Sequence, residues 1–324
     1  MYGNVERSDE YKRRLLDFIR RAYRIDARSV VPATRGYFGE TWRLSADDKD
    51  YFLKLDYSAL HKTVYERSFS VVEHLCSHGI DCVSRIIKTV DGRLSERFDG
   101  AVLGVFDWID GVNMQNESTK IPEYNILGVV YSIPVGNVPI ERDNLSAAVA
   151  DLFFRQWKML NGETTVSASA SARLRAIFEQ YRGRIEHRAN RLNLFSKRCM
   201  PDASHFYITH GDAGGNVMVS GGDYYIVDWD NPRLAPPERD AWFCMYWDWA
   251  MESFNEALRA NGVNYTLRPE RLAYYCYHFF FYYLTEYMHT FFEIGDENGD
   301  LVEALSGYFN GWIEEEIRFA DKMA

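Results

Sequence analysis

The sequence predicts an α+β protein in two lobes, in which a small strand-rich lobe precedes a mainly helical one. The chain has 324 residues, more than the ~250–300 residues at which a single core usually divides. Short strand-like runs and turn-forming glycines fill residues 29–108, whereas long helical patterns dominate beyond Gly111. Aromatic residues make up 15% of the chain, which supplies enough large apolar side chains for two cores.

The first lobe is expected to alternate helices with strands. Apolar residues at helical spacing predict an opening helix, and Gly79 suits the left-handed residue that ends a second helix. The Asp91-Gly92 pair predicts a turn after a strand. The expected elements are a helix over 9–23, a strand over 51–55, a helix over 63–77, and strands over 84–90 and 101–108.

The second lobe is expected to be helical apart from one small insert. Two short strand-like runs, Tyr207-Ile-Thr and Tyr224-Tyr-Ile-Val, lie within this insert at residues 206–230. The expected helices cover residues 144–160, 169–195, 240–260, 268–292 and 301–319. These patterns place the lobe boundary near residue 108, with lobes of 1–108 and 109–324 and a hinge near 105–111.

Composition and charge limit the functional classes. The net charge is −10, and no run of Lys and Arg suits a nucleic-acid backbone. An acidic surface is compatible with a cationic ligand. The five cysteines are scattered, so neither a disulfide framework nor a zinc site is indicated. The most apolar stretch, 272–284, is shorter than the ~20 residues of a membrane span, and the polar N-terminus predicts a cytoplasmic protein without membrane association.

The segment from residue 209 to 230 carries the strongest chemical signal. His210-Gly211-Asp212 is followed by Asn216 and by a strand-like run that ends at Asp228. An Asp in a loop can accept a proton from an attacking hydroxyl, and Asn and Asp supply the hard oxygen ligands that Mg²⁺ prefers. Such a set serves phosphoryl transfer, in which phosphate charge is offset and the acceptor is oriented. Because His-Gly-Asp alone is a common turn, the prediction depends on the joint occurrence of these residues.

These motifs resemble the aminoglycoside phosphotransferase family of the protein-kinase-like superfamily, and the tail 227–243 is most similar to its spectinomycin phosphotransferase branch. The resemblance implies a two-lobed kinase-like fold with an antiparallel sheet in the small lobe. It implies that Asp212 is the catalytic base, that Asn216 and Asp228 bind Mg²⁺, and that Asp240 braces the catalytic loop. The family usually places its Asn five residues after the Asp, whereas Asn216 comes four residues after Asp212.

A nucleotide site is expected in the first lobe. Lys54 lies in the middle of an apolar strand, like the kinase lysine that holds the α- and β-phosphates. Gly36 and Gly39 are expected in the loop that covers those phosphates. We predict Glu66 as the partner of Lys54, because a buried ammonium needs a carboxylate, with Glu73 as the competing candidate. An outward-facing Lys54 and a solvated Glu66 are the structural alternatives.

The hinge is placed by the resemblance alone. In the family, adenine bonds the backbone of the strand that connects the lobes, which here corresponds to Phe106, Asp107 and Ile109. The first lobe would then bind the nucleotide, and the second would carry the catalytic loop and the substrate site.

The resemblance implies an ATP-dependent kinase, with GTP as an alternative donor and Mg²⁺ as cofactor. Its acceptor would be a hydroxyl of a small cationic molecule, such as an aminoglycoside-like antibiotic of the spectinomycin type, and its role would be antibiotic resistance. A metabolic kinase for choline, homoserine or a thiosugar remains an alternative, as does a non-catalytic nucleotide-binding protein. A signalling kinase is disfavoured because Asp-Phe-Gly and Ala-Pro-Glu are absent. We expect a monomer or homodimer.

Overall fold

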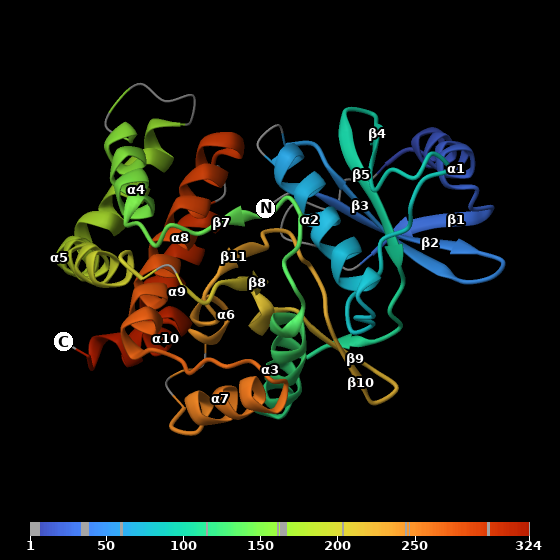
Figure 1. Ribbon diagram of the computed structural model, residues 1–324. Helices are drawn as coiled ribbons and strands as arrows, with labels where there is room; N and C mark the ends of the chain where they lie inside the picture. Colours follow the sequence, from blue (N-terminus) through green and yellow to red (C-terminus); the bar gives the residue numbers. More distant parts are fainter. Residues whose placement is uncertain are drawn as a thin grey trace. The chain divides into compact units, whose positions relative to one another are not determined.

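The chain folds into two compact units. The computed structural model describes residues 7–33, 39–58, 61–114, 116–160, 162, 167–202, 204–243, 245, 247–296 and 299–323. The first unit combines residues 1–142 with 207–234 and 260–263, and the second combines 143–206 with 235–259 and 264–324. Residues 207–234 therefore belong to the same compact unit as the first 142 residues. The predicted lobe boundary at residue 108 had assigned residues 207–234 to the second lobe. Figure 1 labels most of the helices and strands of both units.

A five-stranded antiparallel sheet forms the centre of the first unit. Its strand order is β1-β2-β3-β5-β4, and neighbouring strands pair antiparallel throughout. The strands are β1 (Ala27–Pro32), β2 (Glu40–Ala46), β3 (Asp50–Asp56), β4 (Glu96–Phe98) and β5 (Ala101–Asp107). The predicted strands at 51–55 and 101–108 are thus confirmed as parts of β3 and β5.

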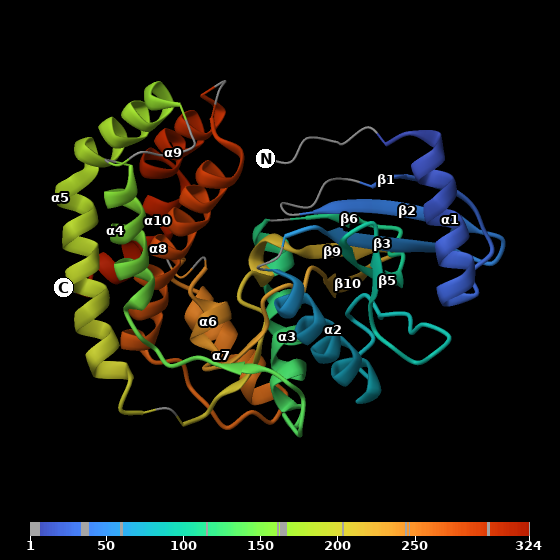
Figure 2. The same ribbon diagram turned by 90° about the horizontal axis from the view of Figure 1, so that it is seen from above.

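Two helices cover opposite faces of this sheet, as Figure 2 shows. Helix α1 (Asp9–Tyr23) begins at the N-cap Ser8 and packs Leu15 and Ile19 against the odd-numbered side chains of β3 and β5 in one apolar cluster. Helix α2 (His61–Ser77) places Phe69 on the other face, 5.2 Å from Phe106 between ring centroids. Because side chains alternate along a strand, Lys54 lies on the face of Phe106.

Two smaller sheets complete the strand content of the described chain. Strands β6 (Val112–Asn113), β9 (Val217–Ser220) and β10 (Asp223–Ile226) form one sheet, and β7 (Glu141–Arg142), β8 (Tyr207–Thr209) and β11 (Arg233–Ala235) form the other. Helix α3 (Glu117–Ser132) starts with a capping box at Asn116 and Thr119. A single 3₁₀ turn, η1 (Ala213–Gly215), separates β8 from β9.

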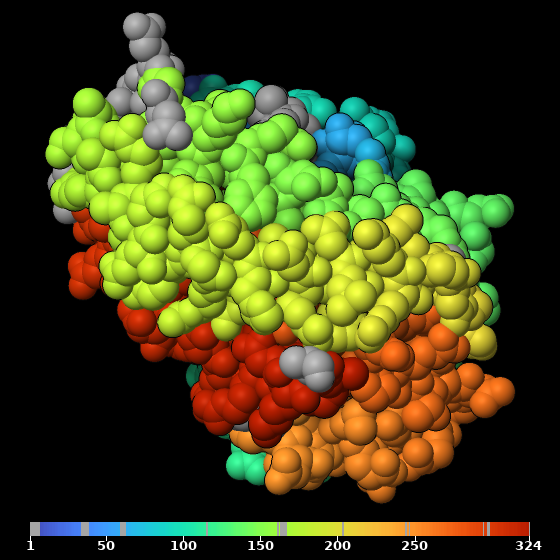
Figure 3. Space-filling model, turned by 90° about the vertical axis from the view of Figure 1, so that its left-hand side faces the viewer, coloured from blue at the N-terminus to red at the C-terminus, as the bar shows by residue number. Residues whose placement is uncertain are grey.

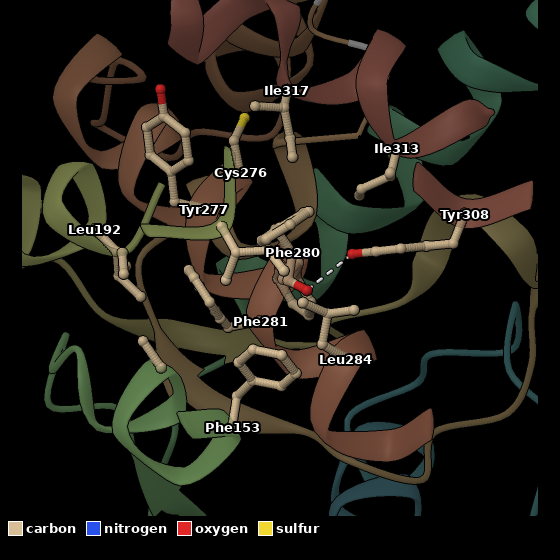
Figure 4. Close-up of a cluster of buried hydrophobic side chains, with 14 of the residues drawn as sticks. Phe153, Leu192, Cys276, Tyr277, Phe280, Phe281, Leu284, Tyr308, Ile313 and Ile317 are labelled. Atoms are coloured by element: carbon tan, nitrogen blue, oxygen red, sulfur yellow. Dashed lines mark hydrogen bonds between the residues drawn. The ribbon is translucent and has the colours of Figure 1, made fainter. Parts of the chain in front are cut away.

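Among its described residues, the second unit contains seven helices: α4 (Ala148–Met159), α5 (Ala168–Cys199), α6 (Glu238–Ala241), α7 (Ala250–Ala260), α8 (Pro269–Ile294), α9 (Asp300–Asn310) and α10 (Trp312–Asp321). Helix α8 is central, because side chains on every side of it are buried. Figure 4 shows Phe280 and Phe281 among Phe153, Leu192 and Tyr308. The Tyr308 hydroxyl donates a 2.8 Å hydrogen bond to the Phe280 carbonyl oxygen. On the surface, α5 forms the long yellow-green band in Figure 3, with the red α10 segment below it.

Most predicted helices are confirmed with shifted ends. The predictions over 9–23, 63–77, 144–160, 169–195 and 268–292 correspond to α1, α2, α4, α5 and α8. Gly79 has a φ of +83° and Gly92 a φ of +79°, as the cap and turn predictions required. The predicted α+β class is therefore confirmed, and no described helix has the length and hydropathy needed to span a bilayer.

Three predictions of secondary structure were wrong. The strand expected over 84–90 is reduced to one bridge between Ile86 and Phe106. The helix expected over 301–319 breaks at Gly311, where a β-carbon would come within 2.5 Å of the Gly307 carbonyl oxygen. The helix expected over 240–260 is divided into α6 and α7. Helix α3, which was not predicted, contains Pro122, a residue that normally weakens a helix interior.

Candidate active site

A cavity of about 460 Å³ lies within the first unit, beside the face of the sheet that α2 covers. The strands contribute Thr41, Phe52, Lys54 and Phe106, helix α2 contributes Ser68, Phe69 and Val72, and the hairpin region contributes Asn216, Met218, Val227, Asp228 and Asp230. The cavity thus combines apolar side chains with a cluster of three charged groups, Lys54, Asp228 and Asp230. A mostly apolar cavity with a few convergent polar groups is typical of a small-molecule site.

Lys54 reaches this cavity because of its register in the sheet. It pairs with Gly104 of β5, and Gly104 has no side chain to crowd the same face. A β-carbon at Gly104 would lie 2.7 Å from the ring of Phe69, so only glycine lets α2 pack this closely. The Lys54 side chain is 6% exposed. The predicted inward-facing lysine is therefore what the structure contains.

Two carboxylates bind the Lys54 ammonium. Its Nζ donates a 2.5 Å hydrogen bond to Asp228 Oδ1 and a second hydrogen bond to Asp230 Oδ2. Burial disfavours the charged ammonium, but the two carboxylates outweigh burial and raise the pKa of Lys54. Lys54 is therefore a permanent cation at neutral pH.

A strained turn brings Asp228 and Asp230 to the same point. Asp228 has a φ of +64°, a left-handed conformation that is uncommon for any residue other than glycine and that often marks functional sites. The Asp230 N–H donates a 2.8 Å hydrogen bond to the Asp228 carbonyl oxygen. The buried Trp229 fixes the turn from behind, because its Nε1–H donates to the Ile226 carbonyl oxygen at 3.0 Å.

The two carboxylates of this turn differ in proton affinity. Burial opposes ionisation of Asp228, but the nearby Lys54 charge outweighs burial and lowers the pKa of Asp228. Burial and the adjacent Asp228 charge together raise the pKa of Asp230 to about 7, despite Lys54. Asp228 is therefore the more acidic carboxyl of the pair, which suits a cation ligand.

His210 links the catalytic loop to the strand that precedes Asp228. Its Nδ1 accepts a hydrogen bond from the Asp212 N–H at 3.1 Å, and its Nε2 lies 2.9 Å from the Val227 carbonyl oxygen. A backbone N–H can only donate and a carbonyl oxygen can only accept, so these contacts require the neutral tautomer protonated at Nε2. The buried ring also packs edge-on against Trp229 at 4.7 Å.

Asp212 and Asn216 are joined across the short catalytic loop. The Asn216 side-chain amide donates to the Asp212 carbonyl oxygen at 2.7 Å and lies 3.3 Å from the Asp212 carboxylate. The residues between them form η1, and Asn216 N–H donates back to the Ala213 carbonyl oxygen. The 3₁₀ turn thus accommodates the loop that is one residue shorter than the family pattern. Asn216 lines the cavity with Asp228, whereas Asp212 is exposed next to it.

The predicted Lys54–Glu66 pair is wrong for this structure. Glu66 is exposed on α2, and its carboxylate binds Arg97 at 2.9 Å. The competing candidate, Glu73, binds Lys88. Successive helix residues differ by about 100° in direction, so Tyr65 rather than Glu66 faces the cavity side of α2, where it is 3% exposed.

Of the two glycines predicted in the phosphate-covering loop, the structure describes only one. Gly36 lies outside the described residues. Gly39 has a φ of +74°, and a β-carbon there would come within 2.3 Å of the Leu55 carbonyl oxygen. Position 39 therefore needs glycine for its conformation and for its close approach to β3. Its role in covering phosphates remains a prediction.

The predicted hinge residues Phe106, Asp107 and Ile109 all line the cavity. The Asp107 backbone is already used, because its N–H donates to the Arg85 carbonyl oxygen and its carbonyl oxygen accepts from Ser84 Oγ. Its carboxylate binds Lys49 and Arg85. Asp107 therefore holds the connecting segment in place, and a base would have to bond its neighbours.

Two residues of the site were not predicted. Asp230 appears in the motif Asp-Trp-Asp, whose second carboxylate is the available signal for its presence. Tyr65 donates a 3.0 Å hydrogen bond to Asp230 Oδ2, and the Lys54 ammonium lies 5.0 Å from the centre of the Tyr65 ring. The only sequence signal for Tyr65 is its position immediately before Glu66.

The donor set of the cavity fits Mg²⁺. No cluster of three His, Cys, Asp or Glu side chains suited to a metal occurs among the described residues. Within that part of the chain, protein side chains alone therefore do not form a complete metal site. One carboxylate from Asp228 and one amide oxygen from Asn216 match Mg²⁺, which commonly combines one or two protein ligands with substrate phosphates. The two carboxylates that already hold the Lys54 ammonium show that the site attracts a cation.

Comparisons with known proteins agree with this geometry. Residues 145–275 match the model of the phosphotransferase enzyme family. This part of the chain is similar to that family, and it makes up less than half of the 324 residues. No curated protein matches the chain at a significant level.

Solved structures show the fold of the chain. A spectinomycin phosphotransferase in complex with ADP and spectinomycin is 18% identical, with a TM-score of 0.75 over 95% of this chain and 98% of that chain. The choline kinase LicA from Streptococcus pneumoniae is 16% identical, with a TM-score of 0.62 over 94% and 98%. The amicoumacin kinase hAmiN, with AMP-PNP and Ca²⁺, is 14% identical, with a TM-score of 0.61 over 97% and 94%. The predicted resemblance and kinase-like fold are therefore confirmed.

Proposed function

We propose that this protein is a phosphotransferase that transfers the γ-phosphoryl group of ATP to a hydroxyl of a small cationic molecule, with Mg²⁺ as cofactor. One observation carries the proposal: Lys54, Asn216 and Asp228 converge on one cavity, and Asp212 is hydrogen-bonded to Asn216 at its edge. Phosphoryl transfer requires charge compensation and positioning rather than covalent catalysis, and these four side chains supply both.

Each side chain has a role in this proposal. Lys54 binds the α- and β-phosphates, and adenine lies against Phe106 and the backbone near Ile109. Asp228 and Asn216 hold Mg²⁺, which compensates the charge of the triphosphate. Asp212 orients the acceptor hydroxyl and takes its proton as the new oxygen–phosphorus bond forms and the bond to ADP breaks. The neutral His210 keeps Asp212 at a fixed distance from the segment after β10 that carries Asp228.

Fold similarity and net charge support one class of acceptor. The spectinomycin enzyme, at a TM-score of 0.75, matches the fold better than the choline kinase at 0.62, and the chain carries a net charge of −10. An aminoglycoside-like antibiotic of the spectinomycin type is the acceptor that we propose, which implies a cytoplasmic resistance enzyme. Choline is the second candidate, because a choline kinase shares the fold and choline is also cationic.

A direct assay distinguishes these possibilities. Purified protein is incubated with Mg²⁺ and ATP or GTP, together with spectinomycin, other aminoglycosides, a macrolide or choline, and each acceptor is weighed by mass spectrometry. The proposal predicts that an aminocyclitol gains one phosphoryl group, and that the Asp212→Asn variant gives no product. Phosphorylation of choline alone would assign the metabolic role. Binding of nucleotide without any phosphorylated acceptor would favour a non-catalytic nucleotide-binding protein.

A further inference from the structure

The side chains around the Lys54 ammonium do not include the helix carboxylate expected there. Glu66 is occupied by Arg97 on the exposed side of α2. The ammonium instead binds Asp228 and Asp230. A lysine that must bind phosphates still needs a partner that keeps it charged and aimed, so a different residue has to serve that purpose.

Asp230 is the group best placed to keep the Lys54 ammonium charged and aimed. It binds the same Nζ as Asp228, and it is separately held by the Tyr65 hydroxyl at 3.0 Å. The Tyr65 ring faces the ammonium at 5.0 Å, a distance at which an aromatic face attracts a cation. Tyr65 is 3% exposed, so this contact is built into the packing of α2.

Asp228 and Asp230 have different roles under the proposed function, on which this inference depends. Asp228 has to share its charge with Mg²⁺ when the nucleotide is bound. Asp230 then remains as the carboxylate available to Lys54, and Tyr65 fixes the direction of Asp230. We propose that Asp230 and Tyr65, rather than Glu66, are the positioning residues that aim Lys54 at the nucleotide phosphates.

The spacing of aromatic residues along α2 is consistent with this role of Tyr65. Tyr65 and Phe69 are four residues apart and therefore share one face of the helix, and both are buried. This face presents a hydroxyl to Asp230 where the glutamate was expected. The second Asp of Asp-Trp-Asp supplies the negative charge that the helix does not.

The test measures nucleotide affinity by displacement of a fluorescent ADP analogue, together with kcat and KM for ATP and for the acceptor. Asp230→Asn keeps the shape of the side chain and removes its charge. We expect about tenfold weaker nucleotide binding and a raised KM for ATP, as for loss of one charge-assisted hydrogen bond, with an unchanged KM for the acceptor. Tyr65→Phe keeps the ring and should give a smaller loss in the same direction. Glu66→Gln is the matched control and should bind nucleotide within about twofold of wild type.

A double-mutant cycle separates positioning from a general structural effect. If Asp230 acts through Lys54, the Lys54→Met, Asp230→Asn double variant binds nucleotide no more weakly than Lys54→Met alone. The inference is overturned if Asp230→Asn binds like wild type, if Glu66→Gln loses as much, or if the two losses add. Wild-type protein that binds no nucleotide would instead overturn the proposed function and the inference with it, whereas normal wild-type binding with an unaffected Asp230→Asn variant overturns the inference alone.

Discussion

At the scale of single residues, the site is organised around one buried cation. Lys54 is held by Asp228 and Asp230, so three ionisable groups are brought together within a small volume before any ligand binds. The left-handed conformation of Asp228 has a cost of the order of 1–2 kcal/mol, and the surrounding contacts of Trp229 and His210 offset it. A preorganised charge arrangement of this kind is what stabilises a transferring phosphoryl group.

Asp212→Asn is expected to abolish turnover while leaving nucleotide binding intact. Asn cannot accept the proton of the hydroxyl, so kcat should fall by about 10²–10⁴-fold, the usual contribution of a general base. Nucleotide affinity should stay within about twofold, because Asp212 does not line the cavity. Steady-state kinetics and nucleotide titration measure the two effects.

A matched control for this variant is Asp223→Asn, at an exposed carboxylate at the start of β10. It should retain wild-type kcat. A near-normal kcat in the Asp212→Asn variant, with the control also normal, would remove Asp212 from the mechanism.

At the scale of elements, glycines set how closely strands and helices approach the site. Gly104 admits the ring of Phe69, and Gly39 admits the Leu55 carbonyl oxygen. Gly39 approaches β3, the strand that carries Lys54, and Gly104 is the residue of β5 that pairs with Lys54. The position of the lysine thus depends on residues that have no side chain.

Gly39→Ala should destabilise the protein more than Gly79→Ala. Both glycines have positive φ, but a β-carbon at position 39 meets a carbonyl oxygen at 2.3 Å and one at position 79 meets nothing within 4 Å. Gly79→Ala should therefore cost only the conformational term of about 1–2 kcal/mol. Gly39→Ala adds a clash with β3 and should also raise the KM for ATP. Urea unfolding and ATP kinetics of the two variants make the comparison, and equal losses of stability would show that the clash is relieved without cost.

Many of the helices and strands, and part of the site, could be predicted from the sequence. The predictions that were wrong have physical causes. Helical spacing predicted α1, and the Asp212–Asn216–Asp228 motif predicted three residues that lie close together. The phase of α2 was not predictable, because it depends on where the helix starts and on Arg97 from β4, which binds Glu66. The expected strand at 84–90 contributes backbone hydrogen bonds to β5 without regular pairing, and an alternating pattern does not distinguish the two cases.

At the scale of the whole molecule, the chain divides into two units with different physical characters. The first carries the described site of Lys54, Asn216 and Asp228, and the second is built on the aromatic helix α8. Long-range pairing between residue 54 and residues 228–230 was predictable only through the family resemblance, because no local pattern reports it. Asp240 is buried in α6 of the second unit, and its bracing role remains a prediction.

Acid should destabilise the second unit through Asp143. Burial would raise the pKa of this carboxyl, but the His278 charge, the Leu145 N–H and the Tyr275 hydroxyl outweigh burial and lower the pKa. The ionised carboxylate therefore stabilises the fold above the unfolded-state pKa of about 3.9. That contribution is lost as the pH falls through the lower folded-state pKa.

Asp143→Asn tests this pH dependence. At pH 7 the variant should lose roughly 1–3 kcal/mol of stability, as for a disrupted buried hydrogen-bond site. The difference from wild type should shrink toward pH 3, because the carboxyl of the unfolded wild-type chain, which has the higher pKa, protonates before that of the folded protein. Urea unfolding at a series of pH values measures both, and a difference that stays constant from pH 7 to pH 3 would contradict the assignment.

The central claim is tested most directly by the binding of a non-hydrolysable ATP analogue, measured by calorimetry with and without Mg²⁺. We predict that Mg²⁺ tightens binding to wild type, that Asp228→Asn loses this gain, and that Lys54→Ala weakens binding about tenfold, as expected for a lost charge-assisted contact. Wild-type affinity in Lys54→Ala, or a full Mg²⁺ effect in Asp228→Asn, would contradict the account.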